Sequence, residues 1–266
     1  MLAFLFSFMP YRYLLGYAKI KIKIFVREMR IPENISTSEL YTVQEEIASK
    51  AIVEDQLGAL RFVAGADQAF FREATNTNTN EREMIISAVV VLEYPSMKFL
   101  YHSSATMPVD FPYIPGLLSF REAPAIIEAF HKLDKKPDLL LIDGCGINHP
   151  RFAGLATHVG VLLDIPTIGV AKNILCGSGT IPGKPGEANL IRYHGREVGY
   201  YFKSKKGCRP LIVAPGHKVS LDTSLNIVKN CIRKHKLPEP TRLAHLCVNK
   251  LKKDKDEVRR LTATNG

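Results

Sequence analysis

The chain has 266 residues, of which 36 are Lys or Arg and 26 are Asp or Glu, so its formal net charge is +10. Hydrophobic residues make up 46% of the chain and charged residues 23%, which excludes wholesale disorder and is typical of a packed globular protein. The positive excess favours a polyanionic partner such as nucleic acid. The five cysteines form no Cys-x-x-Cys pair, which argues against a disulfide framework or a zinc knuckle and favours a reducing cytoplasm.

The first 28 residues differ from the rest, and we interpret them as an N-terminal extension of unknown role. Pro10 and Arg12 interrupt their apolar run, which is far shorter than the roughly 20 residues needed to span a bilayer. The segment also lacks the basic start and small-residue cleavage site of a signal peptide, although a short interfacial anchor stays an alternative. Residues 29–266 are expected to form a single domain without a membrane-spanning segment.

After residue 36 the hydrophobic pattern predicts strands and helices in a defined order. The expected strands cover residues 60–67, 84–94, 98–105, 139–142, 167–170, 190–193, 198–203 and 211–213. The expected helices cover residues 36–56, 125–133, 152–163, 219–235 and 241–252. A Thr/Asn run at 75–80 predicts a turn, and a Pro-rich stretch at 108–115 predicts a loop. Three antiparallel strands followed by alternating helices and strands is the order of ribonuclease H-like α/β domains, with one mixed sheet and helices on both faces.

Two aspartates each follow an apolar strand in a small-residue setting. Asp67 follows Ala-Gly-Ala, and Asp143 follows a run of Leu and Ile. If the first and fourth strands are neighbours, both carboxylates lie at the carboxyl ends of adjacent strands, where sites form in open α/β sheets. Hard oxygen ligands in a basic protein indicate Mg²⁺. The alternative is that each aspartate merely caps a following turn.

Glu122 and Lys172 are two further candidates. Ser119 and Glu122 have the spacing of a capping box, but Pro124 would then fall inside the helix. A helix that begins nearer Pro124 would leave Glu122 free to reach a metal through water. Lys172 follows a buried strand, and we favour a phosphate contact for it over an ion pair with an aspartate.

Residues 111–116, here called the Tyr113 loop, hold an aromatic and an aliphatic residue between prolines. A rigid apolar loop of this kind can be pushed into a base stack and hold it open. The alternative is a surface loop that docks on its own core.

Together these residues resemble the endonuclease V family of deoxyinosine 3′ endonucleases. The resemblance covers about residues 36–252. Its motifs are Ala66-Asp67-Gln-Ala-Phe, Pro112-Tyr-Ile-Pro-Gly-Leu-Leu-Ser-Phe-Arg-Glu122, Ile142-Asp143-Gly-Cys-Gly-Ile-Asn-His149-Pro-Arg, Pro166-Thr-Ile-Gly-Val-Ala-Lys172, Pro215-Gly-His217 and Pro238-Glu-Pro-Thr-Arg-Leu-Ala-His245. Gln68, Ala69 and Cys145 stand where relatives often carry other small or polar residues.

The resemblance implies a role for each group of matching residues. The implied catalytic residues are Asp67, Glu122, Asp143, Lys172 and His245. Among them Asp67 and Asp143 would bind the metal directly and Glu122 through water, with His245 completing or supporting the set. The implied strand-separating wedge consists of Pro112, Tyr113, Ile114 and Pro115. The implied pocket for the flipped base is lined by Gly116, Leu118, Gly144, Gly146 and Gly169. For His149 and His217 we expect structural or phosphate-orienting roles rather than metal ligation.

The implied activity is repair of DNA that contains deaminated bases, by cleavage at the second phosphodiester bond 3′ to deoxyinosine. Mg²⁺ is the implied cofactor, with Mn²⁺ as a substitute, and the products carry 3′-hydroxyl and 5′-phosphate ends. A mispaired hypoxanthine costs least to extrude, and a glycine-lined pocket leaves no room for the C2 amino group of guanine. We expect a cytoplasmic monomer that binds no membrane. The alternatives are an endoribonuclease acting on inosine-containing RNA and a non-catalytic lesion-binding protein.

Overall fold

The computed structural model describes residues 35–74 and 81–263 of the chain. The chain divides into two compact units, Met1–Val43 and Gln44–Gly266, and the second carries all of the described strands. The expected boundary at residue 28 and the expected turn at 75–80 lie outside the described residues. None of the helices in the described part combines the length and the apolar composition that crossing a bilayer requires.

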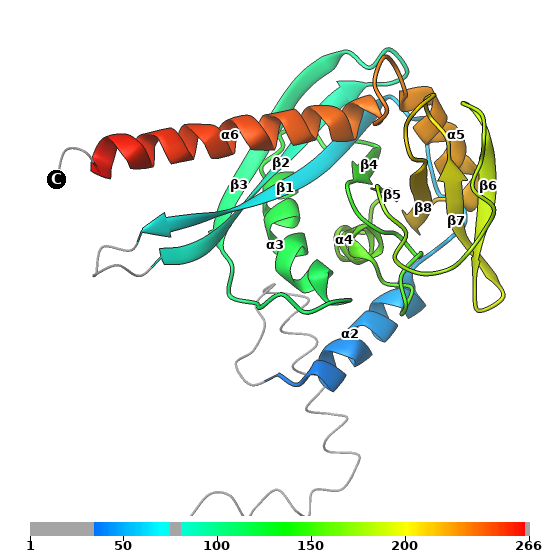
Figure 1. Cartoon of the computed structure of the whole chain (residues 1–266), viewed down its shortest axis with the longest axis horizontal. Helices are drawn as coiled ribbons and strands as arrows, with labels where there is room; N and C mark the ends of the chain where they lie inside the picture. The colour runs from blue at the N-terminus through cyan, green and yellow to red at the C-terminus, as the bar shows by residue number, and fades with distance from the viewer. Residues whose placement is uncertain (1–34, 75–80, 264–266) are drawn as a thin grey trace, which may run out of the picture. The chain divides into compact units, whose positions relative to one another are not determined.

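Eight strands form one mixed sheet. They are β1 (Phe62–Ala74), β2 (Glu81–Glu93), β3 (Phe99–Pro108), β4 (Leu139–Ile142), β5 (Thr167–Ala171), β6 (Ala188–Tyr193), β7 (Arg196–Phe202) and β8 (Leu211–His217). Their order across the sheet is β3-β2-β1-β4-β5-β8-β7-β6 (Figure 1). Strands β1 to β3 are antiparallel, β4 runs parallel to both β1 and β5, and β8, β7 and β6 continue antiparallel. This arrangement confirms the expected mixed α/β sheet and the expected pairing of the first strand with the fourth.

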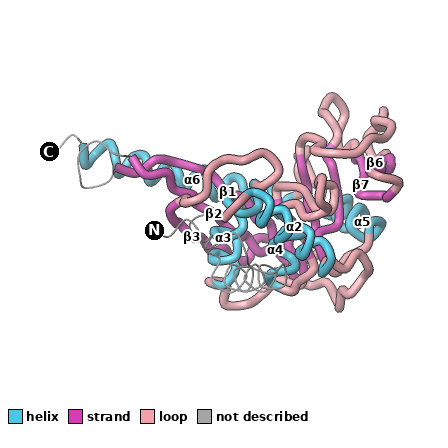
Figure 2. The backbone as a smooth tube through the Cα atoms, turned by 90° about the horizontal axis from the view of Figure 1, so that it is seen from below, coloured by secondary structure: helices cyan, strands magenta, loops and turns pink. Residues whose placement is uncertain are grey.

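The described helices are α2 (Thr37–Lys50), α3 (Leu118–His131), α4 (Leu155–Leu163), α5 (Leu221–Cys231) and α6 (Glu239–Ala263). Alternation along the strands sends Val63, Leu139 and Leu141 to one face, where they pack with residues of α5 and with Ala244 of α6. Helix α6 lies along β1 and β2 on this face (Figure 1; Figure 2), while α3 and α4 pack against each other on the opposite one. Burial on both faces explains why β4 is an unbroken apolar run.

Helix α2 ends at Lys50, six residues before the expected end, because the following backbone pairs with a distant segment. The N–H of Ile52 donates to Nδ1 of His217 at 3.2 Å, and the carbonyl of Ile52 accepts from the N–H of Lys218 at 2.7 Å. These tertiary hydrogen bonds replace those of a longer helix. His217 therefore has a structural contact, as expected from the sequence.

Helix α3 begins at Leu118, with Leu117 as its N-cap and no side-chain cap. The predicted capping box is wrong, because Ser119 lies inside the helix and its hydroxyl bonds to Nδ1 of His158 at 3.0 Å. The alternative start near Pro124 is also wrong, since this proline lies well within the helix. Burial of nine of the fourteen helix residues, which include Glu122, stabilises the helix in spite of the hydrogen bond that proline removes.

Candidate active site

Asp67 lies in the middle of β1, not at its end as expected, because the strand continues to Ala74 in a ladder with β2. The shorter strand β4 stops at Ile142, which pairs with Ala66. The N–H of Asp143 then donates to the carbonyl of Ala66 at 3.1 Å. Asp67 and Asp143 are therefore neighbours at the point where β4 ends and the edge of β1 becomes open.

Glu122 reaches the same place from α3. Gln68 follows Asp67 in the strand, so its side chain points to the opposite face of the sheet, and its Nε2 donates to Oε2 of Glu122 at 2.9 Å. Because β4 has ended, side chains from both faces can approach each other around the open edge of β1. The structure thus brings together the three acidic residues that the sequence proposed.

Burial and mutual repulsion shape the electrostatics of this cluster. Burial, reinforced by the charges of Asp67 and Asp143, raises the pKa of Glu122 to about 8, although Arg121 opposes the shift. Burial and the charge of Asp143 also raise the pKa of Asp67, against a hydrogen bond from His245. Each shift shows that the site disfavours its own negative charge, which a bound cation would relieve.

The donor set fits a hard divalent cation. All three carboxylates offer oxygen ligands, and Oε1 of Gln68 is buried beside them without a hydrogen-bond partner. Within residues 35–74 and 81–263, no group of three or more Asp, Glu, His or Cys side chains is placed so that it could hold a metal ion by itself. Mg²⁺ does not need one, because it binds through one or two carboxylates and keeps several waters. Asp67 and Asp143 are the residues that could hold such an ion directly, with Glu122 behind a water.

Lys172 and His245 each contact one of the aspartates. Nζ of Lys172 forms an ion pair with Oδ2 of Asp143 at 2.5 Å, whereas the sequence favoured a phosphate contact. Nδ1 of His245 lies 2.7 Å from Oδ2 of Asp67, and its Nε2 lies 2.9 Å from Nδ2 of Asn249. Because both ring nitrogens are engaged, His245 supports Asp67 rather than offering an open ligand. Sequence reasoning missed Asn249, which the spacing of one helical turn from His245 could have revealed.

The Tyr113 loop connects β3 to α3 and presents its aromatic side chain to solvent. Tyr113 is 68% exposed, so it does not dock on the core. Pro112 and Pro115 are exposed as well, and Ile114 is half-buried. The loop thus has the exposed tip that a wedge requires.

Three glycines of the expected base pocket serve close contacts within the protein. A Cβ at Gly146 would lie 2.2 Å from the carbonyl oxygen of Pro215, and one at Gly169 would lie 2.4 Å from the nitrogen of Gly146. A Cβ at Gly144 would lie 3.1 Å from the side chain of Leu155. Their absent side chains let the segment after β4 pack against β5 and β8. The expected reason for these glycines, close approach to a base, stays a prediction.

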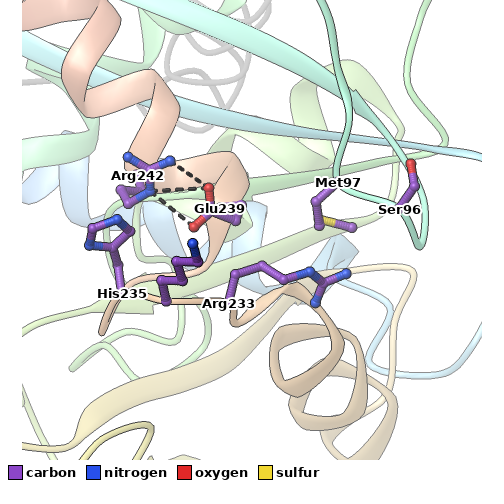
Figure 3. A pocket seen from close by; sticks show the side chains of 7 residues that line it. Ser96, Met97, Arg233, His235, Glu239 and Arg242 are labelled. Carbon is purple, nitrogen blue, oxygen red and sulfur yellow. Dashed lines mark hydrogen bonds and ion pairs between the residues drawn. The ribbon is translucent and has the colours of Figure 1, made fainter.

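A cavity of about 400 Å³ lies away from these carboxylates, between the β2–β3 turn and the start of α6. It is lined by Ser96, Met97, Arg233, Lys234, His235, Glu239 and Arg242. Figure 3 shows that Arg242 points to Glu239, with which it forms an ion pair at 2.5 Å. None of the expected site residues lines this cavity.

Comparison with known proteins identifies the family of this chain. The family model described as Endonuclease V matches residues 44–246. Endonuclease V of Protochlamydia amoebophila (strain UWE25) is 40% identical over 227 residues, which cover 84% of this chain and 92% of the relative. Endonuclease V of Dictyoglomus turgidum (strain DSM 6724 / Z-1310) is 42% identical over 209 residues, or 78% and 87% of the two chains.

Solved structures show the same likeness. The crystal structure of endonuclease V from Streptomyces avermitilis matches with a TM-score of 0.75 and 33% identity, over 86% of this chain and 99% of that one. Endonuclease V of Ciona intestinalis, in complex with a 24-mer DNA containing an inosine followed by a ribo-adenosine, matches with a TM-score of 0.68 and 28% identity. That match covers 82% of this chain and 98% of the other.

Proposed function

Because the chain belongs to the endonuclease V family and is a nuclease, we propose that it cleaves DNA containing deaminated bases at the second phosphodiester bond 3′ to deoxyinosine. The observation that carries the proposal is the meeting of the Asp67, Glu122 and Asp143 carboxylates where β4 ends, on a chain whose net charge is +10. Clustered negative charge would weaken a pure DNA-binding surface, whereas a metal-dependent hydrolase needs it. The inosine-containing DNA bound by the Ciona relative supports the choice of substrate.

In this proposal Asp67 and Asp143 would hold Mg²⁺ directly, Glu122 would hold it through a water, and Mn²⁺ could substitute. The bound ion supplies activation of the attacking water and stabilisation of the leaving 3′ oxygen. Attack on phosphorus breaks the bond to that oxygen and leaves a 3′-hydroxyl and a 5′-phosphate. His245 holds the carboxylate of Asp67 in place through its hydrogen bond. Lys172 pairs with Asp143 in the free protein and would contact the backbone phosphate when substrate is bound.

The Tyr113 loop supplies the second part of the proposed mechanism. Its four wedge residues, Pro112, Tyr113, Ile114 and Pro115, would enter the base stack and hold it open while the damaged base leaves it. The flipped base would then lie against residues 116, 118, 144, 146 and 169. A base that is mispaired beforehand costs least to extrude, which favours deaminated bases.

An inosine-directed endoribonuclease is the second candidate. The strand bound by the Ciona relative carries a ribo-adenosine after the inosine, so a 2′-hydroxyl next to the lesion is compatible with binding in that relative. The same carboxylates and loop would serve either substrate. We place the enzyme in the cytoplasm as a monomer, and the five free cysteines agree with a reducing compartment.

One cleavage experiment tests these alternatives. End-labelled duplexes of one sequence carry deoxyinosine, riboinosine or neither, and are incubated with Mg²⁺, with Mn²⁺ or with a chelator, before the product ends are mapped. We expect a metal-dependent cut at the second phosphodiester bond 3′ to deoxyinosine. The Asp143→Asn variant should lose the cut, while Asp222→Asn, an exposed carboxylate on α5, should keep it.

Three other results would contradict the proposal. Cleavage confined to the riboinosine strand would identify an endoribonuclease. Binding of the lesion without cleavage in either metal would identify a lesion-binding protein. Equal cleavage of the undamaged duplex would identify a general nuclease of the same fold.

A further inference from the structure

The backbone carbonyl of Gly116, at the C-terminal end of the Tyr113 loop, accepts hydrogen bonds from three side chains. Nε2 of Gln44 and Nη2 of Arg151 each lie 2.9 Å from this oxygen, and Nε2 of His149 lies 3.1 Å from it. The N–H of Arg151 donates to Nδ1 of His149 at 3.2 Å, so in the neutral ring Nε2 carries the proton and is the donor. A carbonyl oxygen has two lone pairs, so three donors use its whole capacity to accept hydrogen bonds.

The three donors also hold one another. Nε of Arg151 donates to Oε1 of Gln44 at 2.5 Å, which joins α2 to the segment that follows β4. Gln44 is fully buried and His149 is 4% exposed, so water has little access to their side chains, whereas Arg151 and Gly116 are half-buried. Gly116 has φ = +79°, and a Cβ there would lie 3.0 Å from Nη2 of Arg151, so glycine permits both the turn and the close approach.

The other end of the loop is anchored as well. Nη1 of Arg121 donates to the carbonyl of Phe111 at 2.9 Å, and the ring of Phe111 packs against Phe120 with centroids 6.0 Å apart. Between these two anchors Tyr113 remains exposed at the tip. A loop fixed at both ends loses less conformational freedom on insertion into DNA than a mobile one, because less of that freedom remains to be lost.

We propose that Gln44, His149 and Arg151 are positioning residues, here called the Gly116 clamp, which hold the Tyr113 loop in the geometry that opens the base stack. The inference rests on the proposed function of that loop as a wedge. None of the three residues needs to touch the reacting phosphate. Their effect should therefore depend on whether the substrate has a stack to open.

Two variants test the clamp on duplex and single-stranded substrates that carry the same deoxyinosine. Gln44→Met keeps the size of the side chain and removes both of its hydrogen bonds in the clamp. Arg151→Lys keeps the positive charge but removes the guanidinium group that donates to Gln44 and to the Gly116 carbonyl. We expect the cleavage rate on duplex at low enzyme concentration to fall roughly five- to ten-fold, and the rate on single strand much less. Ser224→Ala is the control, because it removes a hydrogen bond from Ser224 Oγ to the Ser220 carbonyl in α5 and should leave the duplex-to-single-strand ratio unchanged.

A double-mutant cycle with Tyr113→Ala separates positioning from general destabilisation. If the clamp acts through Tyr113, Gln44→Met should cause little further loss on duplex once Tyr113 is gone. The melting temperature of every variant is measured beside its cleavage rates, so that the loss of stability in Gln44→Met can be compared with that in Ser224→Ala.

Provided that the wild-type protein is active, either of two results overturns the clamp. One is an equal loss of cleavage rate on duplex and single strand, and the other is losses on duplex that add fully in the Tyr113→Ala background. A wild-type protein that cuts neither inosine substrate overturns the proposed function itself, and the clamp with it. A selective, non-additive loss on duplex supports the clamp.

Discussion

Asp67 and His245 are joined by a hydrogen bond of 2.7 Å between Oδ2 of the aspartate and Nδ1 of the histidine. The bond links β1 to α6, and it requires the two elements to pack closely. Gly65 permits this approach, since a Cβ there would lie 2.1 Å from the backbone carbonyl of Pro240. The amide of Asn249 lies against the other ring nitrogen and so fixes the tautomer that donates to Asp67. Helix α6 therefore sets the orientation of a proposed metal ligand.

The Asp67→Asn variant should lose cleavage and keep lesion binding. Asparagine still accepts the bond from His245, so the fold is preserved, but the metal loses a charged ligand worth several kcal/mol, and the rate should fall more than about 100-fold. Loss of the negative charge also relieves repulsion of phosphate, so binding should survive or tighten. Nicking rates and fluorescence anisotropy with inosine duplex measure both effects. A folded variant that nicks at nearly the wild-type rate would contradict the assignment of Asp67 as a metal ligand.

The Tyr113→Ala variant should weaken binding to an inosine duplex more than binding to the single strand. An aromatic that stacks on a base contributes about 1–3 kcal/mol, and here it offsets the cost of opening a paired stack. Binding titrations on both substrates provide the comparison. Phe99→Ala is the matched control, because Phe99 is an aromatic on β3 that is 50% exposed outside the Tyr113 loop. Equal losses on both substrates would mean that the loop is not a wedge.

The Gly146→Ala variant should destabilise the fold. The added methyl would collide with the carbonyl of Pro215, and overpacking of this kind typically costs about 1–3 kcal/mol. Gly58→Ala should be neutral or slightly stabilising, because nothing lies within 4 Å of a Cβ there. Urea unfolding of both variants gives the comparison. A Gly146→Ala protein as stable as wild type would show that β8 can move away at this contact.

Acid should destabilise the protein in part through His158. Burial, with a smaller contribution from the charge of His149, lowers the pKa of His158 to about 4. Unfolded histidine titrates near 6.5, so below that pH the unfolded chain binds a proton that the folded chain does not, and stability falls as the pH is lowered towards 4. From pH 7 to pH 5 this loss is on the order of 2 kcal/mol.

The His158→Gln variant should therefore lose less unfolding free energy than the wild type between pH 7 and pH 5. Urea unfolding at the two values measures the difference. His235→Gln removes an exposed histidine and should keep the wild-type pH dependence. An unchanged pH dependence in His158→Gln would show that His158 does not titrate abnormally.

The sequence by itself determined the architecture and the members of the acidic cluster. Buried apolar runs predicted β4 at residues 139–142 and placed β5 to within one residue, because a strand covered on both faces leaves a continuous hydrophobic signal. Local signals also mark the site in the sequence: the small residues around Asp67 and Asp143, and the prolines that bound the Tyr113 loop. Each is a feature of a few consecutive residues.

Only the tertiary structure decided where β1 and α2 end, where α3 begins, and which side chains support the site. Strand β1 runs past Asp67 because residues 68–74 pair with β2, and α2 stops because Ile52 bonds to the segment at 217–218. The partners of Asp67 and of the Gly116 carbonyl come from elements more than 30 residues away in the chain. Hydrophobic periodicity reports which face of an element is buried, but a hydrogen bond between distant elements depends on how they pack, and that is fixed only when the whole chain folds.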